Sequence, residues 1–384
     1  MGMAAASISH TRWERSMVKE YDYLIVGSGL YGSVFAHEMK KRGKSVLVIE
    51  RRSHIAGNIY TEKVKGIDVH KYGPHIFHTD KRAIWDYVES LVPLRQFVYS
   101  PIANYHGELY NMPFNMHTFY AMWGTTTPEA AAKRLEEERA PYRDTTPENL
   151  EQQALKLVGP TIYEKLVKGY TEKQWGRPCR ELPAFIIRRL PVRFNFDNNY
   201  FNDRWQGIPE DGYTALVERL LDGIEVKTDT DFLDDRDGWR EKAQRTVFTG
   251  CIDEFFGRKA GALEYRSLRF EEEELPIENF QGVAGMNYTA ADVPYTRITE
   301  HKHFLKTKSP VTIISREYPR TWKPGLEPYY PVNDEKNSQL YEEYCTMAKE
   351  VPDVTFGGRL GTYRYLNMDQ IIESALHDAE MEEK

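Results

Sequence analysis

The stretch Tyr23-Leu-Ile-Val-Gly-Ser-Gly-Leu-Tyr-Gly32 decides the fold class of this chain, together with Ser45-Val-Leu-Val-Ile-Glu50 shortly after it. An apolar strand enters a turn that the first glycine permits, the second glycine lets the backbone approach a pyrophosphate, and the third lets the following helix pack closely on the strand. The N-terminus of that helix offers amide donors and a positive dipole to the phosphates. The second strand ends in Glu50, placed to accept hydrogen bonds from an adenosine ribose. The pattern predicts a dinucleotide-binding domain, with a glycine turn that binds no ligand as the alternative.

The composition restricts the classes of partner. The 384 residues carry a net charge of -7, and Lys and Arg are spread along the chain, which argues against nucleic acid as the main partner. Three cysteines without CxxC spacing predict no zinc site and favour a reducing cytoplasm. We expect the first twenty residues to be a disordered leader or tag, because they lack the apolar core of a secretory signal. No apolar run is long enough to suggest a membrane span.

The segment from about 115 to 190 reads as helical. Thr127-Pro128-Glu129 and Thr146-Pro147-Glu148 each resemble a helix start, with a cap, a first-turn proline and an acid. Short β-prone runs then indicate an antiparallel sheet, at 263–270, 283–288 and 311–318. The glutamates at 271–274 are expected in a solvated turn.

Two later segments are predicted to rejoin the nucleotide-binding domain. Residues 246–250 and 354–359 read as strands that end in glycine, and a helix from about 368 to 380 follows the second. A parallel sheet tolerates long excursions between its strands. Past the ribose acid, Arg52 leads to Ala56-Gly57-Asn58, a basic residue and glycine segment of the kind common in FAD enzymes, although an ordinary loop is the alternative.

Any chemistry is expected to come from the cofactor. The chain contains neither GxSxG nor HExxH, and we find no paired-carboxylate motif. Several segments combine aromatic residues with arginine, whose planar fork suits a nucleoside diphosphate, at 169–176, 188–193, 198–201, 295–297, 329–330 and 363–365. Each aromatic residue could instead belong to the core. Tyr72-Gly-Pro-His75-Ile-Phe-His78 would place imidazoles near a flavin, with core histidines as the alternative.

With these segments in view, the chain resembles the bacterial UDP-galactopyranose mutase family from Tyr21 to its C-terminus. The motifs GYTEKQWG and VPYTRITEHKHF carry most of the resemblance. The others, in chain order, are GSGLYG, HIAGN, YGPHIFHT, LPVRFNFDNNYF, EPYYPV and FGGRLGTYRYLNMD.

The resemblance implies an α/β fold, in which a Rossmann-like FAD-binding domain with a parallel sheet is joined by an inserted helical domain and an antiparallel sheet domain. After the leader at 1–20, we predict the FAD-binding domain at 21–95, 209–260 and 333–384, the sheet domain at 96–118, 191–208 and 261–332, and the helical domain with a mobile lid at 119–190.

The resemblance also implies an isomerase, specifically an intramolecular transferase. It would interconvert UDP-galactopyranose and UDP-galactofuranose for cell-surface polysaccharide synthesis, with N5 of reduced FAD as the nucleophile at the anomeric carbon. The reaction would cause no net oxidation or reduction of the sugar or the flavin. A homodimer in the cytoplasm and an external reductant such as NAD(P)H are expected, and neither a metal nor a nucleic acid is.

The site residues follow by match of motif. The catalytic set implied is Arg189, Arg297 and His78. The substrate-binding set implied adds Tyr170, Thr171, Trp175, Tyr200, Asn287, Tyr330 and Tyr365 to the two arginines. The cofactor-binding set implied is Gly27, Gly29, Tyr31, Gly32, Glu50, Arg51, Asn58, His75, Ile76, Arg359 and Met368.

The chain departs from the family pattern at three positions. Asn367 stands where many members carry an acid, Val167 replaces an aromatic residue of some relatives, and Tyr99 stands where several have Asn. Two other functions stay open on the sequence. An amine-oxidase-like FAD oxidoreductase shares the nucleotide fold, and a nucleotide-sugar binding protein without turnover would need no reduced flavin.

Overall fold

The computed structural model describes residues 19–187 and 191–382. Most of the predicted leader and the predicted catalytic residue Arg189 therefore lie outside the described residues.

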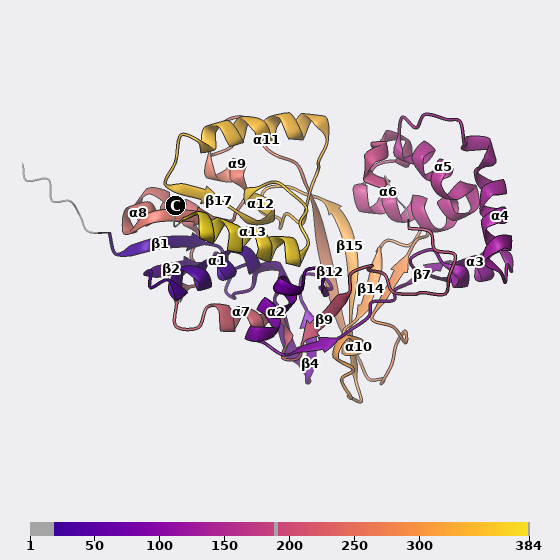
Figure 1. The fold of residues 1–384 in the computed structure, drawn as a ribbon, viewed down its shortest axis with the longest axis horizontal. Helices are drawn as coiled ribbons and strands as arrows, with labels where there is room; N and C mark the ends of the chain where they lie inside the picture. The colour runs from indigo at the N-terminus through magenta and orange to yellow at the C-terminus, as the bar shows by residue number, and fades with distance from the viewer. Residues whose placement is uncertain (1–18, 188–190, 383–384) are drawn as a thin grey trace, which may run out of the picture.

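A five-stranded parallel sheet forms the nucleotide-binding part, at the left of Figure 1. Its strand order is β10 (Glu225–Lys227), β2 (Val46–Ile49), β1 (Tyr21–Val26), β11 (Ala243–Phe248) and β17 (Val354–Phe356). Every neighbouring pair is parallel. Segments from the start, middle and end of the chain thus share one sheet, as the sequence predicted.

The glycine turn after β1 has the predicted geometry. Gly27 has a φ of +101°, which L side chains rarely adopt. A Cβ at Gly32 would lie 2.1 Å from the Gly27 carbonyl oxygen, so helix α1 (Leu30–Lys41) can approach the strand only with glycine there. Helix α13 (Met368–Met381) packs beside α1, and the Tyr31 hydroxyl donates to Asp378 at 2.6 Å.

A seven-stranded sheet lies between the nucleotide-binding part and the helices at the right of Figure 1. Its order is β16 (Tyr330–Pro331), β12 (Tyr265–Leu275), β15 (Thr312–Thr321), β14 (Arg297–Glu300), β13 (Gly285–Tyr288), β7 (Ile102–Tyr105) and β8 (Glu108–Asn111). It is antiparallel except between β13 and β7.

The prediction of a solvated turn at 271–274 is wrong. These glutamates continue strand β12, where they pair with residues 313–316 of β15. Cations neutralise their exposed face: Lys71 meets Glu272 at 2.6 Å and Arg316 meets Glu273 at 2.7 Å. A run of like charges can therefore remain a strand, because cross-strand partners remove the repulsion.

The helical part (residues 116–187) contains α3 (Met116–Trp123), α4 (Pro128–Arg139), α5 (Leu150–Ile162), a π-helix (Tyr163–Lys168) and α6 (Gly169–Trp175). The Thr127 hydroxyl caps α4, as predicted, by accepting from Ala130 N–H at 3.2 Å. The second predicted start is wrong, because α5 begins at Leu150. Asn149 is its cap and accepts from Gln152 N–H at 3.0 Å.

Shorter elements connect these parts. Strands β5 (Phe77–Thr79), β9 (Trp205–Pro209) and β6 (Leu94–Gln96) form a three-stranded sheet, and β3 (Thr61–Val64) pairs with β4 (Ile67–His70). The remaining α-helices are α2 (Arg82–Leu91), α7 (Gly212–Leu220), α8 (Arg236–Lys242), α9 (Ile252–Phe255), α10 (Lys302–Leu305), α11 (Glu335–Ala348) and α12 (Gly358–Gly361).

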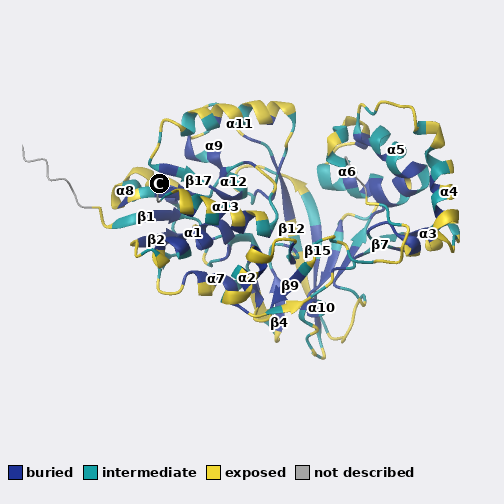
Figure 2. Ribbon diagram, viewed as in Figure 1, coloured by how far each residue is buried: buried dark blue, intermediate teal, exposed yellow. Residues whose placement is uncertain are grey.

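The buried residues of Figure 2 form separate cores. One core lies inside the helical part and includes Phe119, Leu150 and Tyr163. Two further cores cover the faces of the parallel sheet, with Phe35 in one and Phe248 in the other. Among the described residues, no helix is long and apolar enough to cross a membrane.

Candidate active site

A cavity opens beside the C-terminal ends of β1, β2 and β11. This is the edge of a parallel sheet at which ligands bind in doubly wound folds. All the predicted cofactor residues except Ile76 line it. They are Gly27, Gly29, Tyr31, Gly32, Glu50, Arg51, Asn58, His75, Arg359 and Met368. We call this cavity the dinucleotide cleft.

The start of α1 leaves room for phosphate in this cleft. Gly29 is the N-cap of α1, no side chain caps the helix there, and an added Cβ at Gly29 would meet no atom within 4 Å. Gly57 packs against it so closely that a Cβ on Gly57 would lie 2.9 Å from the Gly29 Cα. The open amides and the helix dipole suit an anion, as a pyrophosphate requires.

Glu50 holds the glycine turn as well as facing the cleft. Its Oε2 accepts from the Ser28 amide at 2.9 Å and from the Ser28 hydroxyl at 2.8 Å, and its Oε1 accepts from the Arg52 amide at 2.9 Å. A carboxylate has about four lone-pair positions, so one remains for a ligand hydroxyl. The sequence indicated that Glu50 contacts the ribose of a cofactor, but it did not reveal that Glu50 also supports the glycine turn.

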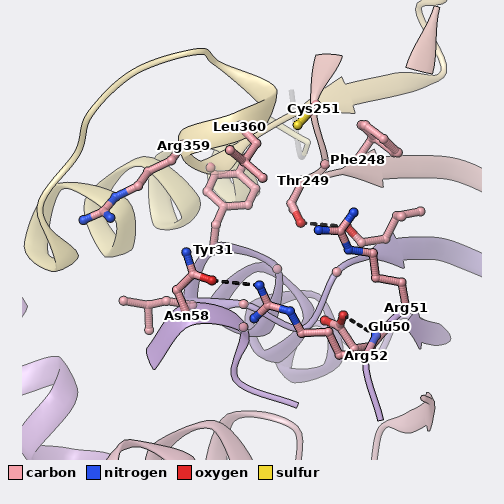
Figure 3. A pocket seen from close by; sticks show the side chains of 18 of the residues that line it. Tyr31, Glu50, Arg51, Arg52, Asn58, Phe248, Thr249, Cys251, Arg359 and Leu360 are labelled. Atoms are coloured by element: carbon pink, nitrogen blue, oxygen red, sulfur yellow. Dashed lines mark hydrogen bonds between the residues drawn. The ribbon is translucent and has the colours of Figure 1, made fainter. Parts of the chain in front are cut away.

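Arg52 connects several parts of the cleft. In Figure 3 its guanidinium meets the Asn58 side chain, at 2.8 Å, and it also meets Glu327 at 2.6 Å. Arg51 reaches the same Glu327 at 3.0 Å. The Arg52 Nη1 is buried without a hydrogen-bond partner among the described residues. A buried donor of this kind indicates that a ligand group completes the site.

A second cavity lies next to the first, and we call it the substrate cavity. Asn58, His75, Arg359 and Met368 line both cavities, so a ligand in one can reach a ligand in the other. The predicted residues in the substrate cavity are His78, Tyr170, Tyr200, Asn287, Arg297, Tyr330, Tyr365 and, from the cofactor set, Ile76. Thr171 and Trp175, predicted to bind substrate, line neither described cavity.

Arg297 is the central cation of the substrate cavity. Its Nε donates to Asn287 at 3.1 Å, its Nη2 donates to the Tyr170 hydroxyl at 3.3 Å, and its Nη1 lies 3.7 Å from the Glu317 carboxylate. Burial opposes the charged form, but Glu317 and the surrounding phenols raise the pKa of Arg297 well above its ordinary value. The guanidinium therefore stays charged where a diphosphate would need it.

Phenols surround Arg297. Burial raises the pKa of Tyr170, of Tyr200 and of Tyr330, and the Glu317 carboxylate adds to the effect at Tyr330. These groups remain protonated at neutral pH and can donate hydrogen bonds to phosphate oxygens. Tyr365 lies beside Tyr330, with ring centroids 5.6 Å apart.

Two histidines differ in their surroundings. Burial and the nearby Arg359 lower the pKa of His75 to about 4, and its Nδ1 donates to the Gly73 carbonyl at 2.9 Å. His75 is therefore neutral, with Nε2 as an acceptor. His78 stacks on Phe201 with centroids 3.8 Å apart, and its Nδ1 donates to the Asp203 carboxylate at 2.5 Å. Asp203 thus sets the orientation of the imidazole and its tautomer.

Sequence reasoning missed several residues of the substrate cavity. Glu317 lines it and was not singled out; Phe201 and Tyr329 also line it and belong to candidate aromatic segments of the sequence, although neither was assigned a role, and Tyr99 was noted only as a departure from the family pattern. Glu317 was overlooked because a carboxylate is unexpected beside a diphosphate. The sequence carried no clear signal for it, since Glu317 stands between Arg316 and Tyr318, and only the structure shows that its side chain is 5% exposed.

Comparison with known proteins identifies the family. A model of the UDP-galactopyranose mutase family matches residues 165–365, and a model of NAD(P)-binding Rossmann-like domains matches residues 25–91. A probable UDP-galactopyranose mutase from Klebsiella pneumoniae is 40% identical over 93% of each chain. The chain belongs to the UDP-galactopyranose mutase family. It is accordingly an enzyme of the isomerase class, an intramolecular transferase, as the resemblance implied.

A second relative carries a different name within this family. A dTDP-fucopyranose mutase from Escherichia coli is 37% identical over 93% of this chain and 97% of its own. A UDP-galactopyranose mutase from Mycoplasma pneumoniae is 27% identical over 94% of this chain and 96% of its own.

Solved structures confirm the fold. A reduced UDP-galactopyranose mutase aligns over 94% of this chain and 93% of its own with a TM-score of 0.73 at 13% identity. A putrescine oxidase bound to putrescine aligns over 94% of this chain and 98% of its own with a TM-score of 0.55 at 12% identity. The amine-oxidase alternative thus shares the fold, whereas the sequence relationship belongs to the mutases.

Proposed function

We propose that this enzyme interconverts UDP-galactopyranose and UDP-galactofuranose and that it needs FAD in its reduced form. One observation carries the proposal: a permanently charged arginine, its side chain 22% exposed, is surrounded by protonated phenols in a cavity that meets the dinucleotide cleft at Asn58, His75, Arg359 and Met368. Cofactor and nucleotide sugar can therefore meet there.

FAD fits the dinucleotide cleft on the grounds of the open helix start, the Glu50 carboxylate and the unpartnered Arg52 Nη1. Gly27, Gly29 and Gly32 would hold its pyrophosphate, and Asn58, His75 and Arg359 would hold its ring end. When bound and reduced, FAD supplies a nucleophilic nitrogen, N5, for the anomeric carbon of the sugar.

The residues of this chain would hold the departing diphosphate and move a proton. Arg297 can bind two oxygens with its fork, and Tyr200, Tyr330 and Tyr365 can donate to others, which stabilises negative charge where it develops. Exchange of a pyranose for a furanose ring moves a proton between two sugar hydroxyls. His78, oriented by Asp203, would take and return that proton at Nε2. Arg189 would complete the diphosphate clamp.

The experiment that tests the proposal compares two redox states. Dithionite-reduced holoenzyme without oxygen is expected to convert UDP-galactofuranose to UDP-galactopyranose, measured by chromatography of the two nucleotide sugars. Oxidised holoenzyme is expected to convert none. Equal turnover in both states, or protein that purifies without flavin absorbance, would contradict the proposal.

A second substrate deserves a parallel assay because the relative at 37% identity is a dTDP-fucopyranose mutase. Both dTDP-fucopyranose and UDP-galactopyranose should be offered to the reduced enzyme at equal concentration. We propose UDP-galactose as the preferred substrate, and a larger kcat/KM for the dTDP sugar would replace it.

Further parts of the proposal concern context. We propose that the enzyme is a homodimer in the cytoplasm and that NAD(P)H is its external reductant. We also propose a role in cell-surface polysaccharide synthesis. The domain boundaries predicted from the sequence are part of the same proposal. The three cysteines, all free, agree with a reducing compartment. Light scattering of the purified protein tests the dimer, and anaerobic bleaching of the flavin by NADPH tests the reductant.

A further inference from the structure

A lysine on helix α6 is held by backbone carbonyls. The Lys173 Nζ donates to the carbonyls of Tyr288, Ala290, Val293 and Tyr295 at 2.7, 2.8, 3.0 and 3.0 Å. These residues belong to the end of β13 and to the loop that leads to β14. An ammonium has three donors and no acceptor, so a group of carbonyls satisfies it fully.

The same face of α6 touches this loop at a second point. A Cβ at Gly169 would lie 2.4 Å from the Thr289 carbonyl oxygen and 2.8 Å from the Ala291 nitrogen. Gly169 and Lys173 are four residues apart and therefore face the same way. Helix and loop are in direct contact at the glycine and joined by hydrogen bonds at the lysine.

The loop joins the two strands that carry the polar groups of the substrate cavity. Asn287 lies at its start in β13, Arg297 lies at its end in β14, and Tyr170 of α6 accepts a hydrogen bond from Arg297. Any shift of α6 against the loop would therefore move Tyr170 away from Arg297.

We propose that Lys173 is a positioning residue, whose ammonium holds helix α6 and Tyr170 in register with the strands that carry Asn287 and Arg297. This inference rests on the proposed function, in which Arg297 binds the diphosphate, and on the predicted contact of Tyr170 with the substrate. Lys173 acts on nucleotide binding through the helix and touches no substrate.

The charges around Lys173 agree with this role. Burial lowers the pKa of Lys173 to about 8, and the Asp292 carboxylate in the loop acts in the opposite direction. On its own helix, Glu172 accepts from the Cys179 amide instead. From strand β12, Arg266 binds the Gln174 carbonyl at the end of α6, at 2.8 Å. A neutral amine has two N–H donors in place of three, so deprotonation loosens the carbonyl cage.

The test measures the dissociation constant of UDP by calorimetry on oxidised holoenzyme. Lys173→Met is expected to weaken UDP binding about tenfold with unchanged flavin content, since the cost of an unsatisfied carbonyl cage is about 1–3 kcal/mol. Lys168→Met is the matched control and should stay within twofold of wild type, because Lys168 pairs with Glu164 and lies over the Tyr163 ring, and neither of these residues lines the substrate cavity. Wild-type affinity should also fall between pH 7 and pH 9, whereas that of Lys173→Arg should not.

Two results would overturn the inference: UDP affinity of Lys173→Met equal to that of wild type, or wild-type affinity that is flat from pH 7 to pH 9. The second result needs no variant and is decisive even where Lys173→Met does not fold. A wild-type holoenzyme that binds no UDP at all would instead overturn the proposed function.

Discussion

Arg297 is the side chain on which the proposed diphosphate contact depends most. It lies between the side chains of Asn287, Tyr170 and Glu317, and it remains charged. Arg297→Ala is expected to reduce kcat/KM about 30-fold or more, because loss of a largely buried charged hydrogen-bond partner costs about 2–5 kcal/mol. Steady-state assay of the reduced enzyme measures the loss, and flavin absorbance is expected to remain.

Arg316→Ala is the matched control for Arg297→Ala. Arg316 lies on the adjacent strand β15 and pairs with Glu273 on the sheet surface. Its removal should change kcat/KM less than twofold. Full activity of Arg297→Ala would show that the diphosphate binds elsewhere.

Glu300 makes stability depend on pH. Burial opposes ionisation, but hydrogen bonds from His303, from the Gln281 and Phe280 amides and from Thr312 lower the pKa of Glu300 to about 2. Because this pKa is below that of the unfolded chain, the stabilisation is present above about pH 4.5 and is lost as the pH falls toward 2. A shift of this size corresponds to about 3 kcal/mol.

Glu300→Gln is expected to lower the free energy of unfolding at pH 7 by about 2–3 kcal/mol and to flatten its fall with acid, since the amide cannot accept all these donors. Urea unfolding at pH 7 and pH 3 measures both effects. The exposed Glu274→Gln is the control and should follow wild type at each pH. A wild-type slope retained in Glu300→Gln would assign the acid sensitivity to other groups.

At the scale of elements, the turn between β1 and α1 contains one glycine that we expect to matter for folding and another that we expect to matter for cofactor binding. Gly32 is needed for the helix to approach the strand, whereas Gly29 faces open space. Gly32→Ala is expected to lower the Tm of the apoprotein by several degrees. Gly29→Ala should leave that Tm unchanged and weaken FAD binding about tenfold or more, because a methyl group then stands at the phosphate position. Thermal scans of apoprotein and flavin titration distinguish the two variants, and similar Tm losses in both would contradict this division.

Local patterns in the sequence predicted the elements where a single physical signal dominates. The glycine turn, the buried strands of the parallel sheet and the Thr127 cap of α4 were all foreseen. The strand at 271–274 was not, because its stability depends on cations more than 40 residues away in sequence. The Asn149 cap was hidden by a stronger pattern three residues earlier.

The site was predictable residue by residue, but not as an arrangement. The resemblance named Arg297 and Tyr170, and the structure joins them by a hydrogen bond. Nothing local in the sequence shows that Glu317 approaches Arg297 or that Lys173 enters a loop 115 to 122 residues away. Long-range pairings of this kind are created by the fold.

At the scale of the whole molecule, separate cores predict separate unfolding steps. The core of the helical part shares no residue with those of the parallel sheet. We expect two transitions in scanning calorimetry of the apoprotein. FAD at 100 times its Kd adds about 2.7 kcal/mol to the nucleotide-binding part and should raise that transition by roughly 5–10 °C. UDP, which we propose to contact Tyr170 of α6, should raise the transition of the helical part. A single transition shifted by both ligands would contradict the expectation.

The order of strands in the parallel sheet has a consequence for synthesis on the ribosome. Strands β1 and β2 leave the ribosome early, yet the neighbours β11 and β17 and the helix α13 that covers α1 come later, the last of them only near residue 381. The apolar surface of α1 therefore stays exposed, or bound by a chaperone, until α13 has been synthesised. The helical part is continuous in sequence and can fold while the rest is still being made. A nascent chain that stops before α13 should be a target for chaperones and proteases, with its helices already formed.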